Sequence, residues 1–351
     1  MNFKNCIYTI VLLTGSLSST RSFAQESTDP LWSHVPETVS PQWGEFIREI
    51  GKERQKSVPT PDDIDSWKAI QTASDKEKEA KADKFAELFG AHYEETKIAG
   101  IPVVKVTPSK IVTKNKIGVY THGGAYVFNS AKAVIQSPML FASRTGLEVI
   151  AIDYTLAPHS KWQKTTDEVV AVFKELARQG FAPGDIVLFG DSAGGGLAAG
   201  ATLKMRNLGM DLPGALILWS PWADISETGD TYATLRDAEP YYTYENLLGP
   251  SALAYADPKD HKHPYVSPVY GDFSKGFPPT LIQGGTKEIF LSNFVRLYQA
   301  LDQAGQNVKL DIYEGMPHVF VPMLPDTPES KAAMTKANDW VTKHLLQKET
   351  K

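Results

Sequence analysis

The stretch of sequence that decides the fold is a glycine-flanked serine, Gly190-Asp191-Ser192-Ala193-Gly194. It directly follows the apolar run Ile186–Phe189 and opens a helix of small residues, Ala193–Asn207. Glycine on both sides lets the chain turn tightly from strand to helix, and the turn exposes the Ser192 hydroxyl above a helix N-terminus, where negative charge is favoured. An idle serine at a glycine-rich helix start is the alternative. The strand, the turn and the added Gly195-Gly196 favour a nucleophile.

Short apolar runs alternate with longer helical segments on both sides of this turn. From about residue 100 onward we expect strands at Val103–Val106, Ile117–Tyr120, Val149–Tyr154, Ile186–Phe189, Ala215–Trp219, Thr280–Gln283 and Val308–Tyr313. Helices are expected at Thr165–Gln179, Ala193–Asn207, Leu291–Ala304 and from about Ser330. Continuous apolar strands joined by helices are typical of an α/β fold with a mostly parallel central sheet and helices on both faces. In such sheets ligands bind at the carboxyl ends of the strands.

Two regions interrupt this alternation. Residues 25–95 are predicted to be helical and peripheral, with helices starting at Ser40-Pro41 and Thr60-Pro61. Their apolar side chains recur with helical spacing at Trp43, Phe46, Ile47 and Ile50, and then at Ile64, Trp67 and Ile70. Residues 222–270, which are rich in Tyr, Pro and Asp, are predicted to form an insertion over one end of the sheet. The apolar stripes either complete the core or cover a site, and the pattern leaves both open.

A second glycine-rich segment, His122-Gly123-Gly124-Ala125-Tyr126, follows the strand Ile117–Tyr120. Attack on an ester carbonyl creates an oxyanion that needs preorganised donors, each worth about 3 kcal/mol. Adjacent glycines let backbone N–H groups turn inward, so the predicted oxyanion hole consists of the N–H groups of Gly123, Gly124 and Ala193. His122 is expected to position this loop and not to act as a second base.

The predicted base is His318, in the loop after the strand Val308–Tyr313. The other histidines fall in segments expected to be peripheral, and the pair His261 and His263 has no apparent third ligand for a metal. The acid that orients His318 should follow the neighbouring strand Thr280–Gln283, and Glu288 is the only carboxylate in that loop. A glutamate that complements a helix dipole is the alternative for Glu288. No metal or cofactor is expected.

The first 24 residues have the pattern of a signal peptide, with Lys4 at the start, an apolar run from Cys6 to Thr14 and the small-x-small site Ser22-Phe23-Ala24. The run is too short for a stable membrane anchor, so a secreted or periplasmic protein is expected. Removal of residues 1–24 takes away Lys4, Arg21 and the only cysteine, and it changes the formal charge from −5 to −7. An acidic protein of this kind does not suggest nucleic acid as a partner.

These segments together resemble the hormone-sensitive-lipase-like family of α/β-hydrolases. The shared motifs are His-Gly-Gly at 122–124, Gly-Asp-Ser-Ala-Gly-Gly at 190–195, Asp153-Tyr154-x-Leu156-Ala157-Pro158, Ser220-Pro221-Trp222-x-Asp224 and Tyr313-x-Gly315-Met316-x-His318-x-Phe320. The resemblance implies an α/β-hydrolase domain at residues 96–351, capped by residues 25–95 and by the 222–270 insertion. It also implies cofactor-free hydrolysis of esters with short to medium acyl chains. Ala125, in place of a third glycine, and Glu288, where many relatives have aspartate, depart from the family pattern.

Two other functions stay open at this point. A lactone or amide hydrolase would use the same triad, because the acyl-enzyme chemistry is shared and the shape of the pocket decides. A non-catalytic binding protein could also be built on this fold. The presence of Ser192, His318, an acid and the glycine loop together favours an enzyme.

Overall fold

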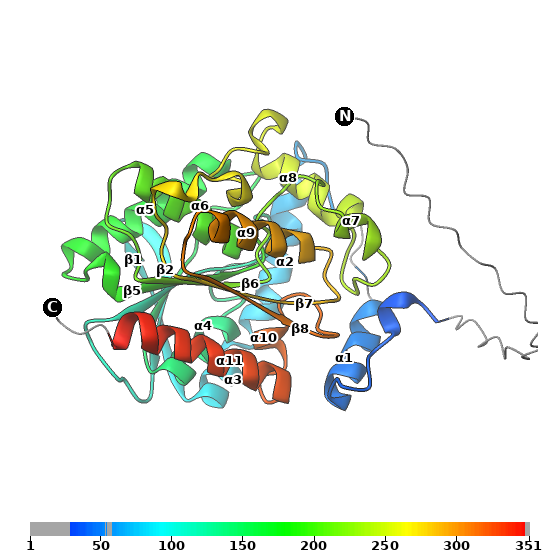
Figure 1. Ribbon diagram of the computed structural model, residues 1–351, viewed down its shortest axis with the longest axis horizontal. Coiled ribbons are helices and arrows are strands. Elements are labelled where there is room, and N and C mark those ends of the chain that lie inside the picture. The colour runs from blue at the N-terminus through cyan, green and yellow to red at the C-terminus, as the bar shows by residue number, and fades with distance from the viewer. Residues whose placement is uncertain (1–28, 53, 55–57, 348–351) are drawn as a thin grey trace, which may run out of the picture.

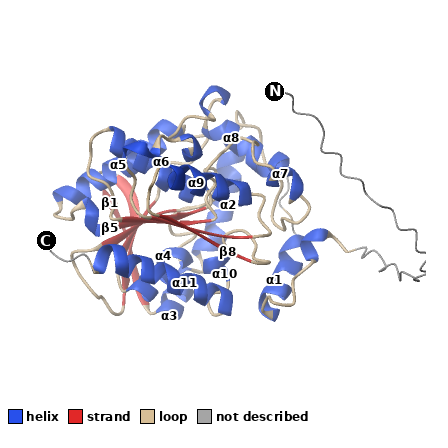
Figure 2. Cartoon of the chain, viewed as in Figure 1, coloured by secondary structure: helices blue, strands red, loops and turns tan. Residues whose placement is uncertain are grey.

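The computed structural model describes residues 29–52, 54 and 58–347, and an eight-stranded sheet runs through it (Figures 1 and 2). The strand order is β1-β2-β4-β3-β5-β6-β7-β8. β2 pairs antiparallel with both β1 and β4, and the other neighbours are parallel. The bounds are β1 Ala91–Ile98, β2 Ile101–Pro108, β3 Ile117–Thr121, β4 Glu148–Ile152, β5 Ile186–Asp191, β6 Ala215–Trp219, β7 Thr280–Gly285 and β8 Val308–Tyr313. The predicted α/β fold is confirmed.

Helices cover both faces of the sheet, which explains why its central strands are apolar throughout. Every residue of β3, β5, β6 and β7 is buried. Figure 2 shows one helical layer above the sheet, formed by α5 Trp162–Arg178, α6 Ala193–Asn207 and α9 Leu291–Gln303. The layer below it contains α3 Ala82–Phe89, α4 Gln136–Thr145, α10 Phe320–Met323 and α11 Pro328–Val341. Two separate apolar cores therefore form, one on each side of the sheet.

The N-terminal helices α1 Pro41–Lys52 and α2 Ile64–Glu79 contribute to both of these cores. Trp43 of α1 is fully buried in the lower core, where its Nε1 donates to Thr327 Oγ1 at 2.9 Å. Trp67 of α2 is fully buried in the upper core. The predicted start of the second helix at Thr60-Pro61 is wrong, because α2 begins at Ile64 and is capped by Asp63, whose side chain accepts from Ser66 N. Ile64 itself is exposed and packs against neither core.

The region predicted to be helical up to residue 95 instead ends in an edge strand. β1 pairs with β2 through a tight turn at Ala99 and Gly100, both of which have positive φ. Most β1 side chains are exposed and several are charged, so the strand lacks the apolar run that marks the others. The helix α4 was also missed from the sequence. The predicted signal peptide, residues 1–24, lies outside the described residues.

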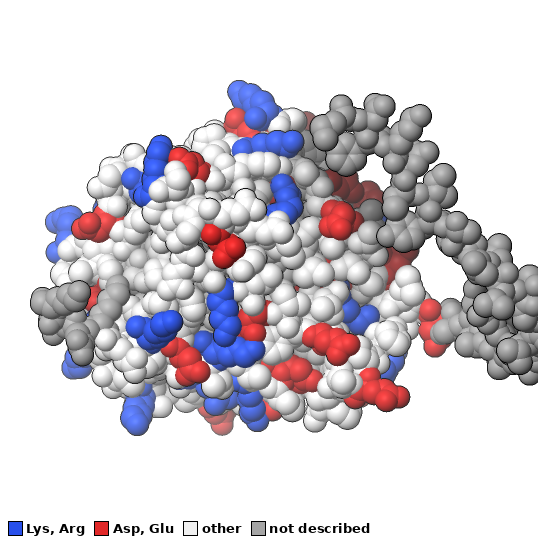
Figure 3. Space-filling model, in the orientation of Figure 1, with Lys and Arg blue, Asp and Glu red and all other residues white. Residues whose placement is uncertain are grey.

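The surface of the described residues carries charges of both signs. Figure 3 shows lysines and arginines interspersed with aspartates and glutamates on one face. No helix within residues 29–52 and 58–347 combines the length and apolar character that a membrane span requires.

Candidate active site

The parallel strands bring the predicted site residues to one edge of the sheet, because each of these residues follows the carboxyl end of its strand. His122 follows β3, Ser192 follows β5, Glu288 follows β7 and His318 follows β8. Neighbouring strands end at the same level of the sheet, as β5 and β6 do where Asp191 lies opposite Trp219. The loops that follow these strands therefore lie side by side. The structure therefore gathers side chains that are up to 196 positions apart in the sequence.

Ser192 occupies a strained turn between β5 and α6, with φ 53° and ψ −125°. A side chain rarely adopts this conformation, and such strain persists only where the surroundings enforce it. Here the Ser192 N–H donates to Trp219 O at 2.9 Å and its carbonyl accepts from Gly196 N at 3.1 Å. A Cβ added at Gly194 would lie 2.0 Å from Thr121 O, so glycine is required for the helix to start against β3.

His318 and Glu288 form a buried pair. His318 Nδ1 lies 2.7 Å from Glu288 Oε2, and the Glu288 side chain is fully buried. The other carboxylate oxygen, Oε1, accepts from Gly285 N at 2.6 Å and from Ser220 Oγ at 2.8 Å. The rings of Phe290 and Tyr242 stand edge-on to the imidazole. Both oxygens of the carboxylate are therefore hydrogen-bonded, and the imidazole is held in one orientation.

Ser192 and His318 line one cavity of about 380 Å³. Gly123, Gly124 and Asp191 line the same cavity. A serine hydroxyl, an imidazole and a glycine loop thus face a common space, which is the arrangement that acyl transfer requires.

The glycine loop packs directly against the serine, because a Cβ at Gly123 would lie 3.1 Å from Ser192 Cβ and 2.3 Å from Asp191 Oδ2. The Asp191 carboxylate therefore lies directly behind Gly123. Gly124, at φ 121°, and Ala125 follow in the loop and also line the cavity. Gly123 and Gly124 thus border the cavity beside Ser192, and Ala193 follows Ser192 directly, so the three predicted oxyanion donors lie around the serine.

Asp191 and His122 lie behind the loop as buried polar groups. Burial raises the pKa of Asp191 to about 6, although hydrogen bonds from Tyr120 and Gly123 lower it. Burial lowers the pKa of His122 to about 4, so the ring is neutral. His122 Nδ1 lies 2.8 Å from Gly123 O, and its ring stacks on Tyr154. These contacts fit the positioning role that was predicted for His122.

The loop is also held from the N-terminal helix α2. Asn129 Nδ2 donates to Gly123 O at 3.0 Å, and Lys78 Nζ of α2 donates to Asn129 Oδ1 at 2.6 Å. Gln71 Nε2, also on α2, donates to Val127 O at 2.7 Å. Helix α2 therefore contacts the site as well as the core.

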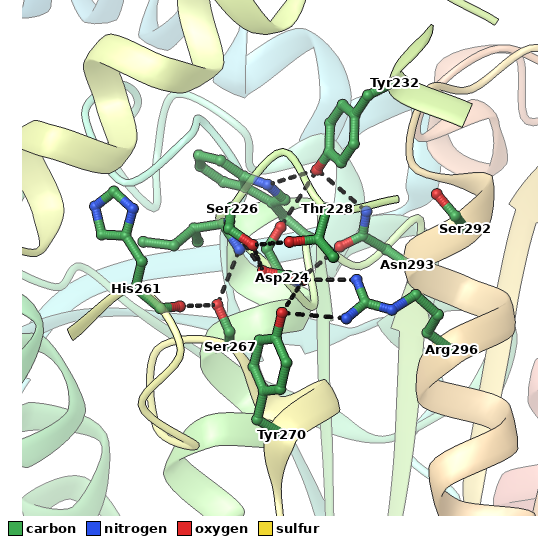
Figure 4. Close-up of polar contacts among 12 residues, drawn as sticks. Asp224, Ser226, Thr228, Tyr232, His261, Ser267, Tyr270, Ser292, Asn293 and Arg296 are labelled. Atoms are coloured by element: carbon green, nitrogen blue, oxygen red, sulfur yellow. Dashed lines mark hydrogen bonds and ion pairs between the residues drawn. The ribbon is translucent and has the colours of Figure 1, made fainter. Parts of the chain in front are cut away.

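The 222–270 insertion forms one wall of the cavity with Tyr241, Tyr242, Leu247 and Leu248. It is fixed to α9 by a buried polar cluster around Asp224 (Figure 4). Asp224 Oδ2 accepts from Arg296 Nη1 at 2.6 Å and from the Tyr270 hydroxyl at 2.9 Å. His261 contributes only its backbone carbonyl to this cluster, by accepting from Ser267. Within the described residues no set of three His, Cys, Asp or Glu side chains could hold a metal ion.

Two residues of the site were missed from the sequence. Ser220 follows β6 and joins the two loops of the pair, because its hydroxyl donates to Glu288 and accepts from Val319 N at 3.0 Å. Glu239 lies in the insertion, fully buried, and accepts from Tyr241 N at 3.1 Å and Ile289 N at 3.3 Å. Burial raises the pKa of Glu239 to about 7, with His318 lowering it and Glu288 raising it. Ser220 stands in a motif shared with the family, whereas nothing in the sequence marks Glu239.

Comparison with known proteins agrees with this geometry. Residues 118–322 match the family described as alpha/beta hydrolase fold. The chain belongs to the α/β-hydrolase family. An acetyl-hydrolase of Streptomyces hygroscopicus is 34% identical over 62% of this chain and 73% of its own length.

Two solved structures extend the comparison of this α/β-hydrolase to the whole fold. The crystal structure of an esterase aligns with a TM-score of 0.80 at 31% identity, over 89% of this chain and 96% of the other. An esterase from the bacterial hormone-sensitive lipase family aligns with a TM-score of 0.74 at 27% identity, over 87% of this chain and 99% of the other. The predicted resemblance to hormone-sensitive-lipase-like α/β-hydrolases is confirmed.

Proposed function

We propose that this protein is a serine carboxylic-ester hydrolase in which Ser192 is the nucleophile, His318 the base and Glu288 the acid. The observation that carries the proposal is the buried His318–Glu288 pair, which borders the same cavity as the strained Ser192. The relatives described as acetyl-hydrolase and esterase support the choice of ester substrates.

The reaction proceeds in two halves. Ser192 Oγ attacks the ester carbonyl carbon while His318 accepts the hydroxyl proton, and Glu288 stabilises the imidazolium that forms. The tetrahedral intermediate collapses when the carbon–oxygen bond of the ester breaks, and His318 returns the proton to the leaving alcohol. A water molecule then gives a proton to His318 and attacks the acyl carbonyl carbon, and His318 passes this proton to Ser192 Oγ as the bond to the serine breaks and the acid leaves.

The oxyanion of each intermediate needs donors that are not otherwise used. We assign this role to the N–H groups of Gly123, Gly124 and Ala193, since the glycine loop packs against Ser192 and borders the cavity. Gly123 also allows the close packing of the loop on Ser192. Each donor of this kind contributes about 3 kcal/mol to catalysis.

The size and lining of the cavity support short to medium acyl chains. A volume of about 380 Å³ accommodates a small ester, and Tyr241, Tyr242, Leu247 and Leu248 give it an apolar wall. Each methylene of the acyl chain that this wall covers adds about 0.8 kcal/mol of binding free energy, until the chain reaches the end of the cavity.

A substrate panel and a covalent label test the function together. We expect p-nitrophenyl esters to be hydrolysed by the wild type and not by Ser192→Ala, and a fluorophosphonate to label Ser192 alone. Lactones and amides belong in the same panel. A kcat/KM for a lactone or amide well above that for every linear ester would replace the ester assignment, and a protein that neither reacts nor labels would be a binding protein.

Export is a separate part of the proposal. The N-terminal pattern supports cleavage after Ala24 and a secreted or periplasmic enzyme. The intact mass of protein recovered outside the cytoplasm tests this, with a chain beginning at Gln25 expected and a full-length cytoplasmic chain contradicting it.

A further inference from the structure

The active-site cavity has a second wall whose chemistry differs from that of the insertion. This lysine wall consists of Lys78, Lys81, Asn129 and Gln136. Lys78 comes from α2, Lys81 from the turn before α3, Asn129 from the glycine loop and Gln136 from α4. An alkyl chain gains little from such a surface, because it would have to desolvate two ammonium groups.

The Lys78 ammonium lacks a bonded counter-charge. Its Nζ donates to the neutral oxygen of Asn129 at 2.6 Å, and it forms no ion pair with any residue in the described part of the chain. Burial lowers the pKa of Lys78, and the charge of Asp75 offsets this only in part. An ammonium has three donors, so two of them are available to a ligand.

Lys81 adds a second positive charge, and its own salt bridge is weak. Its Nζ lies 3.2 Å from Glu77 Oε1, and both side chains are more than half exposed, so this pair contributes little. The one carboxylate among the described lining residues, Asp191, already accepts a hydrogen bond from Tyr120. The wall is thus positive in a protein whose formal charge is −5.

We propose that the lysine wall binds a carboxylate carried by the ester substrate, so that the preferred substrates have one anionic end, as half-esters of dicarboxylic acids do. This inference rests on the proposed ester hydrolysis and narrows its substrate class. The carboxylate remains unchanged in the reaction. It accepts charge-assisted hydrogen bonds from Lys78 and Lys81 while the ester carbon lies at Ser192.

Two matched substrate pairs test for the anion on either side of the ester bond. Monomethyl glutarate is compared with methyl pentanoate for the acyl side, and 4-(butanoyloxy)butanoate with butyl butanoate for the alcohol side. The quantity measured is the ratio of kcat/KM for the charged ester to that for the neutral ester. Because Lys78 also holds Asn129, its loss slows both esters of a pair, and the ratio removes that shared effect.

The expected changes follow from the burial of each lysine. Lys78→Met should lower the ratio about five- to twentyfold for at least one pair, and Lys81→Met about two- to threefold because water screens its exposed charge. Lys78→Arg, which keeps the charge, should retain most of the ratio. Lys84→Met is the matched control, since Lys84 lies exposed on α3 away from the cavity lining and should leave the ratio unchanged.

Ratios that stay at the wild-type value in both Lys78→Met and Lys81→Met, for both pairs, would overturn the lysine wall as an anion site. Calorimetric titration of Ser192→Ala with monomethyl glutarate gives a readout that does not depend on turnover. Binding that weakens about tenfold in Ser192→Ala/Lys78→Met supports the site even if the wild type cleaves no ester, in which case the proposed function alone fails. Binding of equal strength in both proteins overturns it.

Discussion

The Ser220 hydroxyl donates to Glu288 Oε1 at 2.8 Å and accepts from Val319 N at 3.0 Å. One side chain from the end of β6 therefore connects the acid loop after β7 with the loop that carries His318 after β8. Ser220 has a positive φ of 48°, which shows that the chain is bent out of the strand to place this hydroxyl. The orientation of the His318 imidazole thus depends on three adjacent strands.

Replacing Ser220 with alanine should reduce kcat about tenfold and leave KM nearly unchanged. The reason is that Glu288 loses a donor to its charged form and the His318 loop loses its anchor. Steady-state kinetics on a short-chain ester measure the effect. Ser143→Ala, which removes a hydroxyl bonded only within α4, is the control. A Ser220→Ala enzyme with wild-type kcat would show that the link is only structural.

Glu288→Gln should reduce kcat about 10³- to 10⁴-fold, because an amide cannot stabilise the imidazolium and can favour the wrong tautomer. Glu288→Asp keeps the charge on a side chain one methylene shorter, so we expect a smaller loss. Circular dichroism and thermal melting establish that both variants fold. Near-normal turnover in Glu288→Gln would mean that another carboxylate, of which Glu239 is the nearest candidate, orients His318.

The stability of Glu239→Gln relative to the wild type should be greater at alkaline pH than at acid pH. Burial raises the pKa of Glu239 from 4.5 to about 7, so the folded state holds a proton that the unfolded state releases. The stability of the wild type therefore falls as pH rises from about 4.5 to about 7, by a Glu239 contribution on the order of 3 kcal/mol. The glutamine side chain of the variant is neutral at every pH, so the variant lacks this loss.

Thermal melting of the wild type and Glu239→Gln at about pH 5 and about pH 8 measures this difference. Other buried groups, such as Asp191, titrate equally in both proteins and cancel. A gap in Tm between the two proteins that is the same at both pH values would contradict a raised pKa at Glu239.

Trimming a cavity wall should change the preferred acyl length. Leu247→Ala widens the insertion wall and Phe85→Ala widens the cavity at α3. The variant that enlarges the acyl side of the cavity should move the optimum of kcat/KM to acyl chains about two carbons longer in a series of p-nitrophenyl esters. Each additional methylene that becomes buried contributes about 0.8 kcal/mol of binding free energy. Leu88→Ala, exposed on α3 outside the cavity, is the control. If both wall variants prefer the same acyl length as the wild type, these side chains do not limit the length of the acyl chain.

The sequence predicted those features that depend on local pattern. Ser192 was predicted as a site residue because its strand, turn and helix are contiguous, and Glu288 because one loop held a single carboxylate. The edge strand β1 was missed because its exposed charged residues lack an apolar run. The hydrogen bond from Tyr120 to Asp191 joins β3 to β5, which the sheet brings together, so no short window of sequence shows it. Glu239 was missed for the same reason, since only its burial in the folded insertion distinguishes it from a surface glutamate.

The bond from Trp43 to Thr327 connects residues 284 positions apart. Ser40 likewise contacts Glu329, 289 positions away, through its N–H and its hydroxyl. The lower core can therefore close only after almost the whole chain has been synthesised, and such distant contacts make folding slow. Under the export proposed above, this delay is an advantage, because the N-terminal helix α1 has nothing to pack against in the lower core until the last helix arrives.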